Sequence, residues 1–360
     1  TMKINKIIII SLALFIWTAC ENNNTTSSDF EPNSSWIFVA NEGISNSLDE
    51  NDNVPGSISM IDDVGNVYET DAIGDVVQSL EVYKDKLIVI VNNDHKIILY
   101  DITEAEGIKL PGVIVSTGNS SPREMVVIDD NIYFTNWETQ DVKILNLQNN
   151  QIEESTISID GRPENIIYDG TYIWVSIPEL SESDGNQGTK VAQIDPNTNL
   201  LIDYIEVGKG PTQLTEFNNS IFISRTYYEY EGVDDNGWWI NPQIHHGTSK
   251  ISDIIDIKPY GTGSACGGSI LSYNNQVYRS FEGGIAPIKD NLDINELGRL
   301  GNYQQDQVYH VEIINDNIWF CITNWLDINL VNVVNSNGQE IASYNVGIGP
   351  GDLAYWKKSE

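Results

Sequence analysis

The chain has 360 residues, of which 40% are hydrophobic, and its 52 acidic residues against 19 lysines and arginines give a formal net charge of −33. This composition can supply a large core and argues against global disorder. Because so acidic a surface repels phosphate backbones, we expect no nucleic-acid partner, and solubility is the simplest interpretation of the charge.

Residues 1–19 predict a signal peptide. Two lysines precede the apolar run IIIISLALFIW, which is well short of the roughly 20 residues that a membrane-spanning helix needs. Thr18, Ala19 and Cys20 resemble the lipobox of bacterial lipoproteins, although Trp17 stands where that motif has an aliphatic residue. The resemblance implies cleavage before Cys20 and its lipidation. We expect an exported protein anchored to the outer membrane and exposed at the cell surface, with a periplasmic location left open. An exported protein with an incidental cysteine is the alternative.

A phrase of alternating apolar and aromatic residues recurs along the chain. The clearest pair is IYFTNW at residues 132–137 and IWFCITNW at residues 318–325. Most copies have further apolar runs before and after them, separated by Asn, Asp and Gly turns, and the copies lie near residues 35, 86, 131, 172, 220, 276 and 317. Four short strands per repeat are typical of a propeller blade.

The two ends of the chain together contain the strands of one blade. The first repeat begins at its second strand, SSWIFVAN, and the chain ends with GPGDLAYWK, which is similar to the first strands of the other repeats. One blade is therefore expected to form from both termini, which closes the ring and protects the sheet edges. The sequence predicts an all-β fold with a single seven-bladed β-propeller over residues 35–360, after a flexible tether at residues 20–34.

Three short segments carry a family resemblance: YFTN at residues 133–136, IDPNTN at residues 194–199 and VGKGP at residues 207–211. They resemble the YVTN-type, YncE-like β-propeller family, over about residues 35–357. Within that family, an acidic surface lipoprotein with aromatic residues on one face is most similar to the BtuG-type cobalamin-binding lipoproteins. The resemblance implies cobalamin as a ligand rather than a cofactor, and a TonB-dependent-type outer-membrane transporter as partner.

The ligand face is expected where second strands end and first strands begin, because these loops open on the same side of a propeller. The strand ends place there Asn41, Glu42, Asn92, Asn93, Asn136, Trp137, Ser176, Arg225, Tyr227, Tyr228, Ser280, Phe281, Asn324 and Trp325, and the loops before first strands add Arg123, Arg162 and Lys209. Aromatic walls with a few polar groups suit a large, flat ligand. The asparagines have a second interpretation, as strand ends that bond nearby backbone, and the tryptophans as ordinary packing residues.

The fifth repeat has an unusually long loop, residues 227–247, rich in Tyr and Trp. Long loops in compact folds are typically functional or disordered, and the aromatic content argues against disorder. We interpret it as a flap over the ligand face with Trp238 or Trp239 as its anchor, the alternative being a cover for a neighbouring blade. His245 and His246 are adjacent, so on a strand they point to opposite sides and do not share a metal ion.

Motifs for catalysis and metal binding are missing from the sequence. It contains no G-x-S-x-G, H-E-x-x-H or phosphate-loop pattern, so we expect no enzyme activity and no metal site. The loop with Asp49, Asn51 and Asn53 resembles the start of a calcium loop but lacks its glycine and distal glutamate, which favours a solvated acidic loop. Cys266 and Cys321 are interpreted as free, buried thiols, with a disulfide between them left open.

The leading hypothesis is a surface lipoprotein that binds a small ligand, cobalamin first, and passes it to a transporter. Its predicted ligand-binding residues are Glu42, Asn93, Asn136, Trp137, Arg225, Tyr227, Tyr228, Trp238, Trp239, Phe281, Asn324 and Trp325. One alternative is a metal-dependent propeller lyase or lactonase, which a bound metal ion ringed by carboxylates would favour. The other is a protein-interaction or surface-layer module, which a flat face without a pocket would favour.

Overall fold

The computed structural model describes residues 34–45, 53–181, 187–234, 239–263 and 268–359. The predicted signal peptide, the lipidation site Cys20, the tether, and Asp49, Asn51, Trp238 and Cys266 lie outside the described residues. Within the described part of the chain, no helix is long and apolar enough to cross a membrane.

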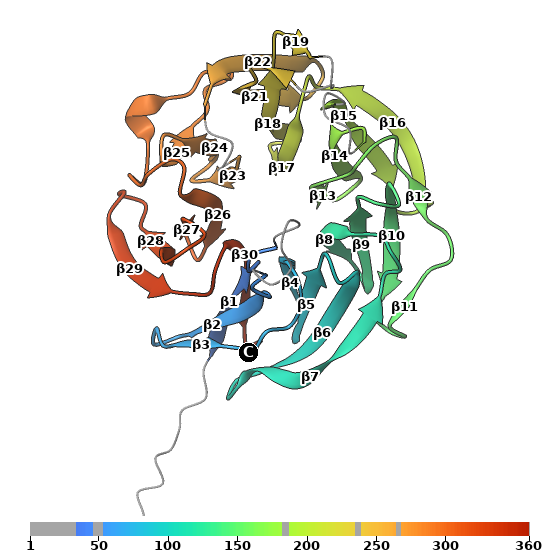
Figure 1. The fold of residues 1–360 in the computed structure, drawn as a ribbon, viewed down its shortest axis with the longest axis vertical. Coiled ribbons are helices and arrows are strands. Elements are labelled where there is room, and N and C mark those ends of the chain that lie inside the picture. The colour runs from blue at the N-terminus through green and yellow to red at the C-terminus, as the bar shows by residue number, and fades with distance from the viewer. Residues whose placement is uncertain (1–33, 46–52, 182–186, 235–238, 264–267, 360) are drawn as a thin grey trace, which may run out of the picture. The chain divides into compact units, whose positions relative to one another are not determined.

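The described residues form a seven-bladed β-propeller, which confirms the predicted fold class (Figure 1). From the inside outward, blade 1 contains β30 (Pro350–Lys357), β1 (Ser35–Asn41), β2 (Ser57–Asp62) and β3 (Val67–Glu69). Blade 2 contains β4 (Val77–Tyr83), β5 (Lys86–Val91), β6 (Lys96–Thr103) and β7 (Gly107–Ser116). Blade 3 contains β8 (Pro122–Ile128), β9 (Asn131–Asn136), β10 (Asp141–Asn146) and β11 (Gln151–Ile152), and β12 (Ile157–Ser158) also pairs with β10.

The remaining blades follow the same order. Blade 4 contains β13 (Ile166–Tyr168), β14 (Ile173–Glu179), β15 (Gln187–Asp195) and β16 (Leu200–Glu206). Blade 5 contains β17 (Pro211–Phe217), β18 (Ser220–Glu229), β21 (Gln243–Ile251) and β22 (Ile255–Thr262), with a hairpin of β19 (Gly232–Val233) and β20 (Trp239–Ile240). Blade 6 contains β23 (Ile270–Tyr273), β24 (Gln276–Phe281) and β25 (Gly284–Pro287), followed by the 3-10 helix η2 (Glu296–Gly298). Blade 7 contains β26 (Val308–Ile314), β27 (Asn317–Thr323), β28 (Asn329–Val334) and β29 (Glu340–Asn345).

The recurring phrase is the second strand of each blade. Its strands are apolar on both sides because they are covered on both faces by the neighbouring sheets. The same position holds a fully buried phenylalanine in three of them, Phe38 in β1, Phe134 in β9 and Phe320 in β27. Apolar clusters join consecutive blades, as where Phe38 of blade 1 and Leu87 of blade 2 belong to one cluster. Burial between sheets therefore explains why the chain repeats this pattern.

The turns predicted from Asn and Asp residues are tight hairpins. Both central residues have positive φ in Asn218-Asn219, Asn274-Asn275 and Asn315-Asp316, each of which joins a first strand to a second. Two-residue turns of this kind match the right-handed twist of the strands, and Asn and Asp tolerate the left-handed region better than most residues.

Closure through both termini is also confirmed. β1 pairs antiparallel with β30, with Phe38 opposite Ala354 and Trp36 opposite Trp356. Figure 1 shows β1, in blue, beside the C-terminal strand β30, in red. The N-terminal strand thus occupies the second position of a blade whose innermost strand comes from the C-terminus, so the ring closes without an exposed inner strand edge.

Candidate functional site

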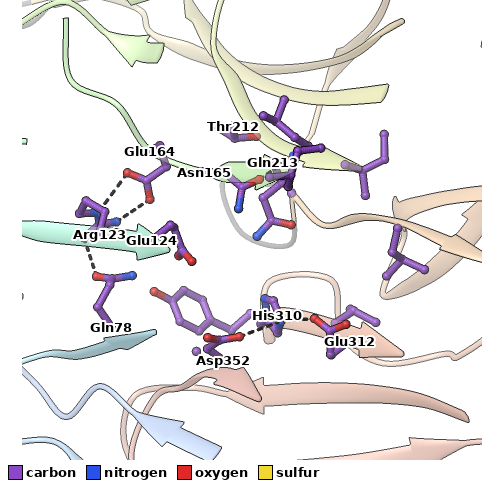
Figure 2. A pocket seen from close by; sticks show the side chains of 18 of the residues that line it. Gln78, Arg123, Glu124, Glu164, Asn165, Thr212, Gln213, His310, Glu312 and Asp352 are labelled. Carbon is purple, nitrogen blue, oxygen red and sulfur yellow. Dashed lines mark hydrogen bonds and ion pairs between the residues drawn. The ribbon is translucent and has the colours of Figure 1, made fainter. Parts of the chain in front are cut away.

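A cavity of about 1040 Å³ lies at the centre of the ring (Figure 2). Residues from the innermost strand of every blade line it, namely β4, β8, β13, β17, β23, β26 and β30. These seven strands belong to seven different blades. The cavity is therefore built from positions that are far apart in the chain.

The lining of the cavity is acidic. Among the described residues that line it, one arginine, Arg123, and one histidine, His310, face seven carboxyl groups, those of Glu42, Glu81, Glu124, Glu164, Glu179, Glu312 and Asp352. Because the carboxylates outnumber the cations, the cavity attracts positive charge and hydrogen-bond donors and disfavours polyanions.

Arg123 is held firmly on one side of the cavity. Its Nε and Nη2 donate to the two carboxylate oxygens of Glu164 at 3.0 and 2.7 Å, and its Nη1 donates to Oε1 of Gln78 at 2.5 Å. Burial lowers the pKa of Arg123, but Glu164, Glu124 and Glu42 together raise it by more, so the guanidinium stays charged. A bidentate pair of this kind has a fixed geometry, and it orients the guanidinium over a neighbouring ring.

Aromatic side chains gather at the mouth of the cavity on the face where second strands end. The guanidinium of Arg123 lies 4.1 Å from the centre of the Trp137 ring and that of Arg162 lies 5.1 Å from it. Trp239 has ring contacts with Tyr228, at a centroid distance of 4.8 Å, and with Tyr230, stacked at 5.0 Å. Trp137, Tyr228 and Trp239 all line the cavity, so its mouth combines flat apolar surface with fixed positive charge.

Several cavity carboxyls titrate far above their usual range. Burial raises the pKa of Glu42 to about 7, although the hydrogen bond that the Tyr309 hydroxyl donates to it opposes this shift. Burial raises the pKa of Glu81 to about 7 as well, with Asp352 and Glu312 adding to the shift. Burial likewise raises the pKa of Glu124 well above its usual range. Near neutral pH Glu42 and Glu81 can therefore accept or donate a proton.

Three cavity side chains converge from two neighbouring inner strands. His310 and Glu312 belong to β26, and Asp352 belongs to β30. Nε2 of His310 lies 3.5 Å from Oε2 of Glu312 and 3.8 Å from Oδ1 of Asp352. Burial lowers the pKa of His310, while Glu312, Asp352 and Glu42 together raise it by more, so it lies above its usual value. Burial raises the pKa of Asp352 to about 6.

Four of the predicted ligand residues line this cavity: Glu42, Trp137, Tyr228 and Trp239. Arg123, which the loops before first strands suggested, lines it too. Trp238 lies outside the described residues, so the choice between Trp238 and Trp239 as anchor of the fifth-repeat loop stays a prediction.

Most predicted asparagines have structural partners instead. Asn136 is fully buried, and its Nδ2 donates to the carbonyls of Phe134 and Asp141 at 3.1 and 3.4 Å. Asn324 bonds within its own loop, where it donates to Asp327 and accepts from the backbone N–H groups of Leu326 and Ile328. The exposed Asn93 donates to Ser45 and Asp75. These contacts favour the interpretation that the asparagines end strands and shape turns.

The other predicted residues lie away from the central cavity. Arg225 is buried and donates to the carbonyls of Lys209 and Lys258 at 3.3 and 3.2 Å. Its guanidinium lies 5.4 Å from the ring of Tyr227, which is also buried. Phe281 borders a separate cavity of about 180 Å³ between blades 5 and 6, and Trp325 packs edge-on against Tyr309 at 4.9 Å.

Sequence reasoning missed most of the polar lining. The missed residues are Gln78, Glu81, Glu124, Glu164, Asn165, Thr212, Gln213, Tyr309, His310, Glu312 and Asp352. The predictions concentrated on second-strand ends, whereas these residues lie in the first strands or, for Glu164 and Asn165, directly before one. These residues could have been found from polar residues within otherwise apolar first strands, such as His310 and Glu312 in YHVEII and Asp352 in GPGDLAY. Cys321, predicted to be a buried thiol, is buried and free.

No protein-family model matches the chain, and no curated protein matches it. Solved structures do match. Apo AztD from Citrobacter koseri is 11% identical, with 92% of this chain and 100% of that chain covered and a TM-score of 0.55. Virginiamycin B lyase from Staphylococcus aureus is 14% identical, with 77% of this chain and 87% of that chain covered and a TM-score of 0.51. A functionally unknown protein from Desulfotomaculum acetoxidans is 14% identical, with 90% and 99% covered and a TM-score of 0.60.

AztD and virginiamycin B lyase are β-propellers, and this chain is a β-propeller with seven blades. At such low identities the likeness shows the fold alone, because one fold hosts many functions. What this protein binds has to be argued from its own cavity.

Proposed function

We propose that this protein is an exported ligand-capture propeller that binds a large, flat small molecule in its central cavity, with cobalamin as the leading candidate. The observation that supports this most directly is a cavity of about 1040 Å³ with Trp137, Tyr228 and Trp239 at its mouth. Small-molecule pockets typically measure about 300–1,000 Å³. This cavity therefore suits a ligand at the large end of that range.

The chemistry of the lining agrees with such a ligand. Cobalamin presents a flat macrocycle that carries amide N–H donors around its edge. Aromatic rings at the mouth supply stacking surface, and the carboxyl and amide oxygens below supply acceptors for those donors. A ligand with several negative charges would be repelled by the same carboxylates.

The proposal includes a lipid anchor at Cys20 and delivery to a TonB-dependent-type outer-membrane transporter. Cys20 lies outside the described residues, so this part depends on the resemblance of Thr18, Ala19 and Cys20 to a lipobox. Metabolic labelling with a radioactive fatty acid tests the anchor. We expect label in the wild-type protein and none in Cys20→Ala, and equal labelling of both would overturn the anchor.

Isothermal titration of the purified protein with cyanocobalamin, in buffer containing EDTA, tests the ligand. We expect saturable binding, weakened strongly in Trp137→Ala and in Trp239→Ala, with haem and an iron-free siderophore as controls for unspecific binding to aromatic surface. Absence of binding to cyanocobalamin, or binding of equal strength to all three compounds, would overturn cobalamin as the ligand.

A second candidate function is an acid–base enzyme. The observation in its favour is that Glu42 and Glu81 have pKa values of about 7 within one cavity, where a carboxyl can act as general acid or base. A fold neighbour described as a virginiamycin B lyase has been solved with quinupristin, which supplies a test compound. Liquid chromatography with tandem mass spectrometry after incubation with quinupristin tests this candidate, because elimination opens a ring without changing the mass. A linear isomer with a new retention time and new fragments is expected from a lyase, and unchanged quinupristin would count against that activity.

The third candidate, a protein-interaction or surface-layer module, would have been favoured by a flat face without a pocket. A face that opens into a cavity of this size is hollow rather than flat.

A further inference from the structure

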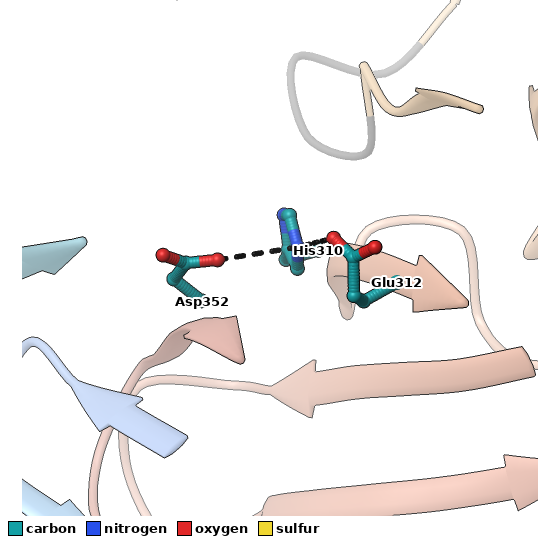
Figure 3. Close-up of side chains that lie close together, drawn as sticks. All are labelled: His310, Glu312 and Asp352. Atoms are coloured by element: carbon teal, nitrogen blue, oxygen red, sulfur yellow. Dashed lines mark ion pairs between the residues drawn. The ribbon is translucent and has the colours of Figure 1, made fainter. Parts of the chain in front are cut away.

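The three converging side chains of the cavity have the composition of a metal site. His310 and Glu312 are two residues apart on β26, so both point to the same side of that strand, toward the axis. Asp352 reaches the same point from β30 of the adjacent blade (Figure 3). The potential ligand atoms of the three side chains all lie within 4.8 Å of one another.

The spacing of these atoms is close to what a metal ion requires. Bonds of about 2.0–2.2 Å to nitrogen and oxygen in a tetrahedral arrangement imply ligand atoms about 3.4 Å apart. Nε2 of His310 is 3.5 Å from Oε2 of Glu312 and 3.8 Å from Oδ1 of Asp352. All three pairs of atoms lie within 4.8 Å, so bonding to one ion requires the side chains to approach one another by about 1.4 Å or less.

His310 adds an observation that points to a ligand. Its Nε2 atom is buried and makes no hydrogen bond of ordinary geometry with the described residues, since the carboxylate oxygens of Glu312 and Asp352 lie 3.5 and 3.8 Å away. A buried polar atom without a partner costs free energy, so such atoms are rare unless something binds them. A proton shared with the carboxylates satisfies this nitrogen in part, and a metal ion would satisfy it together with both carboxylates.

The surroundings of the cluster favour a divalent cation with open coordination positions. Oδ2 of Asp352 accepts the backbone N–H of Leu80 at 2.7 Å, which fixes the orientation of this carboxylate. Outer contacts of this kind position ligands in metal sites. The other side of the cluster borders the cavity, and Glu81 adds a further carboxyl group there.

We propose that His310, Glu312 and Asp352 form a divalent transition-metal site in the wall of the central cavity, with Zn²⁺ as the probe. An imidazole nitrogen favours first-row transition metals over Mg²⁺ and Ca²⁺, which prefer sites made only of oxygen. Three protein ligands leave at least one position free for water or for a donor atom of a bound molecule. The site is independent of the identity of the captured ligand.

Titration calorimetry of the EDTA-treated, dialysed protein with Zn²⁺ tests this site in the absence of any organic ligand. We expect one tight site, weakened by roughly 100-fold or more in His310→Gln and in Glu312→Gln. Glu81→Gln is the matched control because it makes the same Glu-to-Gln change in the same cavity but removes none of the three ligands. Its affinity for Zn²⁺ should change by less than about tenfold.

Two further measurements distinguish loss of Zn²⁺ binding from loss of folding in the variants. Circular dichroism and thermal melting without metal show whether each variant folds, and Zn²⁺ should raise the melting temperature of the wild type but not of His310→Gln. Co²⁺ provides an optical readout, since its visible absorption changes when an imidazole nitrogen and carboxylates replace water.

Three results would overturn the site: unchanged Zn²⁺ affinity in folded His310→Gln, an equal loss in Glu81→Gln, or tighter binding of Ca²⁺ than of Zn²⁺. The last two would indicate general attraction of cations to an acidic cavity. Because cyanocobalamin is titrated in EDTA and Zn²⁺ without cobalamin, either proposal can fail while the other stands.

Discussion

The two Thr-Asn-Trp segments, residues 135–137 in blade 3 and residues 323–325 in blade 7, share three residues and differ in structure. In blade 3 the segment begins one residue after the buried Phe134, and Asn136 is the last residue of β9. In blade 7 it begins three residues after the equivalent Phe320, and β27 already ends at Thr323. The second segment is therefore displaced by two positions relative to its strand.

That displacement gives the two tryptophans different surroundings. Trp137 follows its strand directly and lines the cavity beside the guanidinium of Arg123. Trp325 lies in the loop beyond, has φ of 61°, and packs against Tyr309. Its ring also occupies the space beside Gly349, where a Cβ would lie 2.5 Å from Cζ3 of Trp325. The same three-residue segment thus marks the second strand of a blade in both places but does not give its tryptophan the same role. The position of the tryptophan relative to the end of the strand decides where its side chain points.

The largest expected effect is a difference in ligand affinity between these two tryptophans. Trp137→Ala removes a ring at the cavity mouth and should weaken ligand binding by about 2–4 kcal/mol, the range of a strong binding residue. Trp325→Ala removes a ring outside the cavity and should change affinity by less than about 1 kcal/mol. Calorimetric titration with cyanocobalamin measures both, and equal losses in the two variants would contradict the distinction drawn here.

A second effect concerns Glu42, which links the two regions because it lines the cavity and accepts a hydrogen bond from Tyr309, the packing partner of Trp325. Its pKa rises from 4.5 to about 7 on folding, so the folded state binds more protons between these pH values. Stability is therefore expected to fall as pH rises from about 4.5 to about 7, by up to roughly 3 kcal/mol for this group.

Urea unfolding at pH 5 and pH 8 measures this dependence. Glu42→Gln keeps an oxygen that can accept from Tyr309 but cannot ionise, so it should be more stable than the wild type at pH 8 and similar to it at pH 5. Glu106→Gln is the control, because it removes a carboxylate from the exposed surface. A Glu42→Gln variant that is less stable than the wild type at pH 8 would show that the buried carboxylate is not the cause.

The smallest expected effect separates the two asparagines of the segments. Asn136→Ala removes a buried side chain that donates to two backbone carbonyls, at an expected cost of about 1–3 kcal/mol of unfolding free energy. Asn324→Ala removes bonds within a partly exposed loop and should cost about 1 kcal/mol or less. Chemical denaturation compares them, and a larger loss for Asn324→Ala would reverse the assignment of the structural role.

Much of the fold could be predicted from sequence because its signals are local. Alternating apolar residues and Asn turns occur within a few residues of one another, and each second strand is recognisable alone, as in SWIFVAN and KLIVIV. The likeness of GPGDLAYWK to other first strands predicted the pairing of β1 with β30. Blade 6 fits the pattern less well, since its described part has three strands rather than four.

The site could be predicted only where the signal was an aromatic residue at a strand end, as for Trp137, Tyr228 and Trp239. With 52 acidic residues in the chain, no local pattern selects the few carboxyls that meet at the axis. His310 and Asp352 come from different blades and approach each other because β30 closes the ring beside β26.

The sequence by itself thus determined the strands, the turns and the number of blades, because each depends on residues close together in the chain. Only the tertiary structure decided which polar groups share the cavity, since closure of the ring sets their distances and burial. Burial in turn shifts the pKa values of Glu42, Glu81 and Asp352, a property that none of these residues has in the unfolded chain.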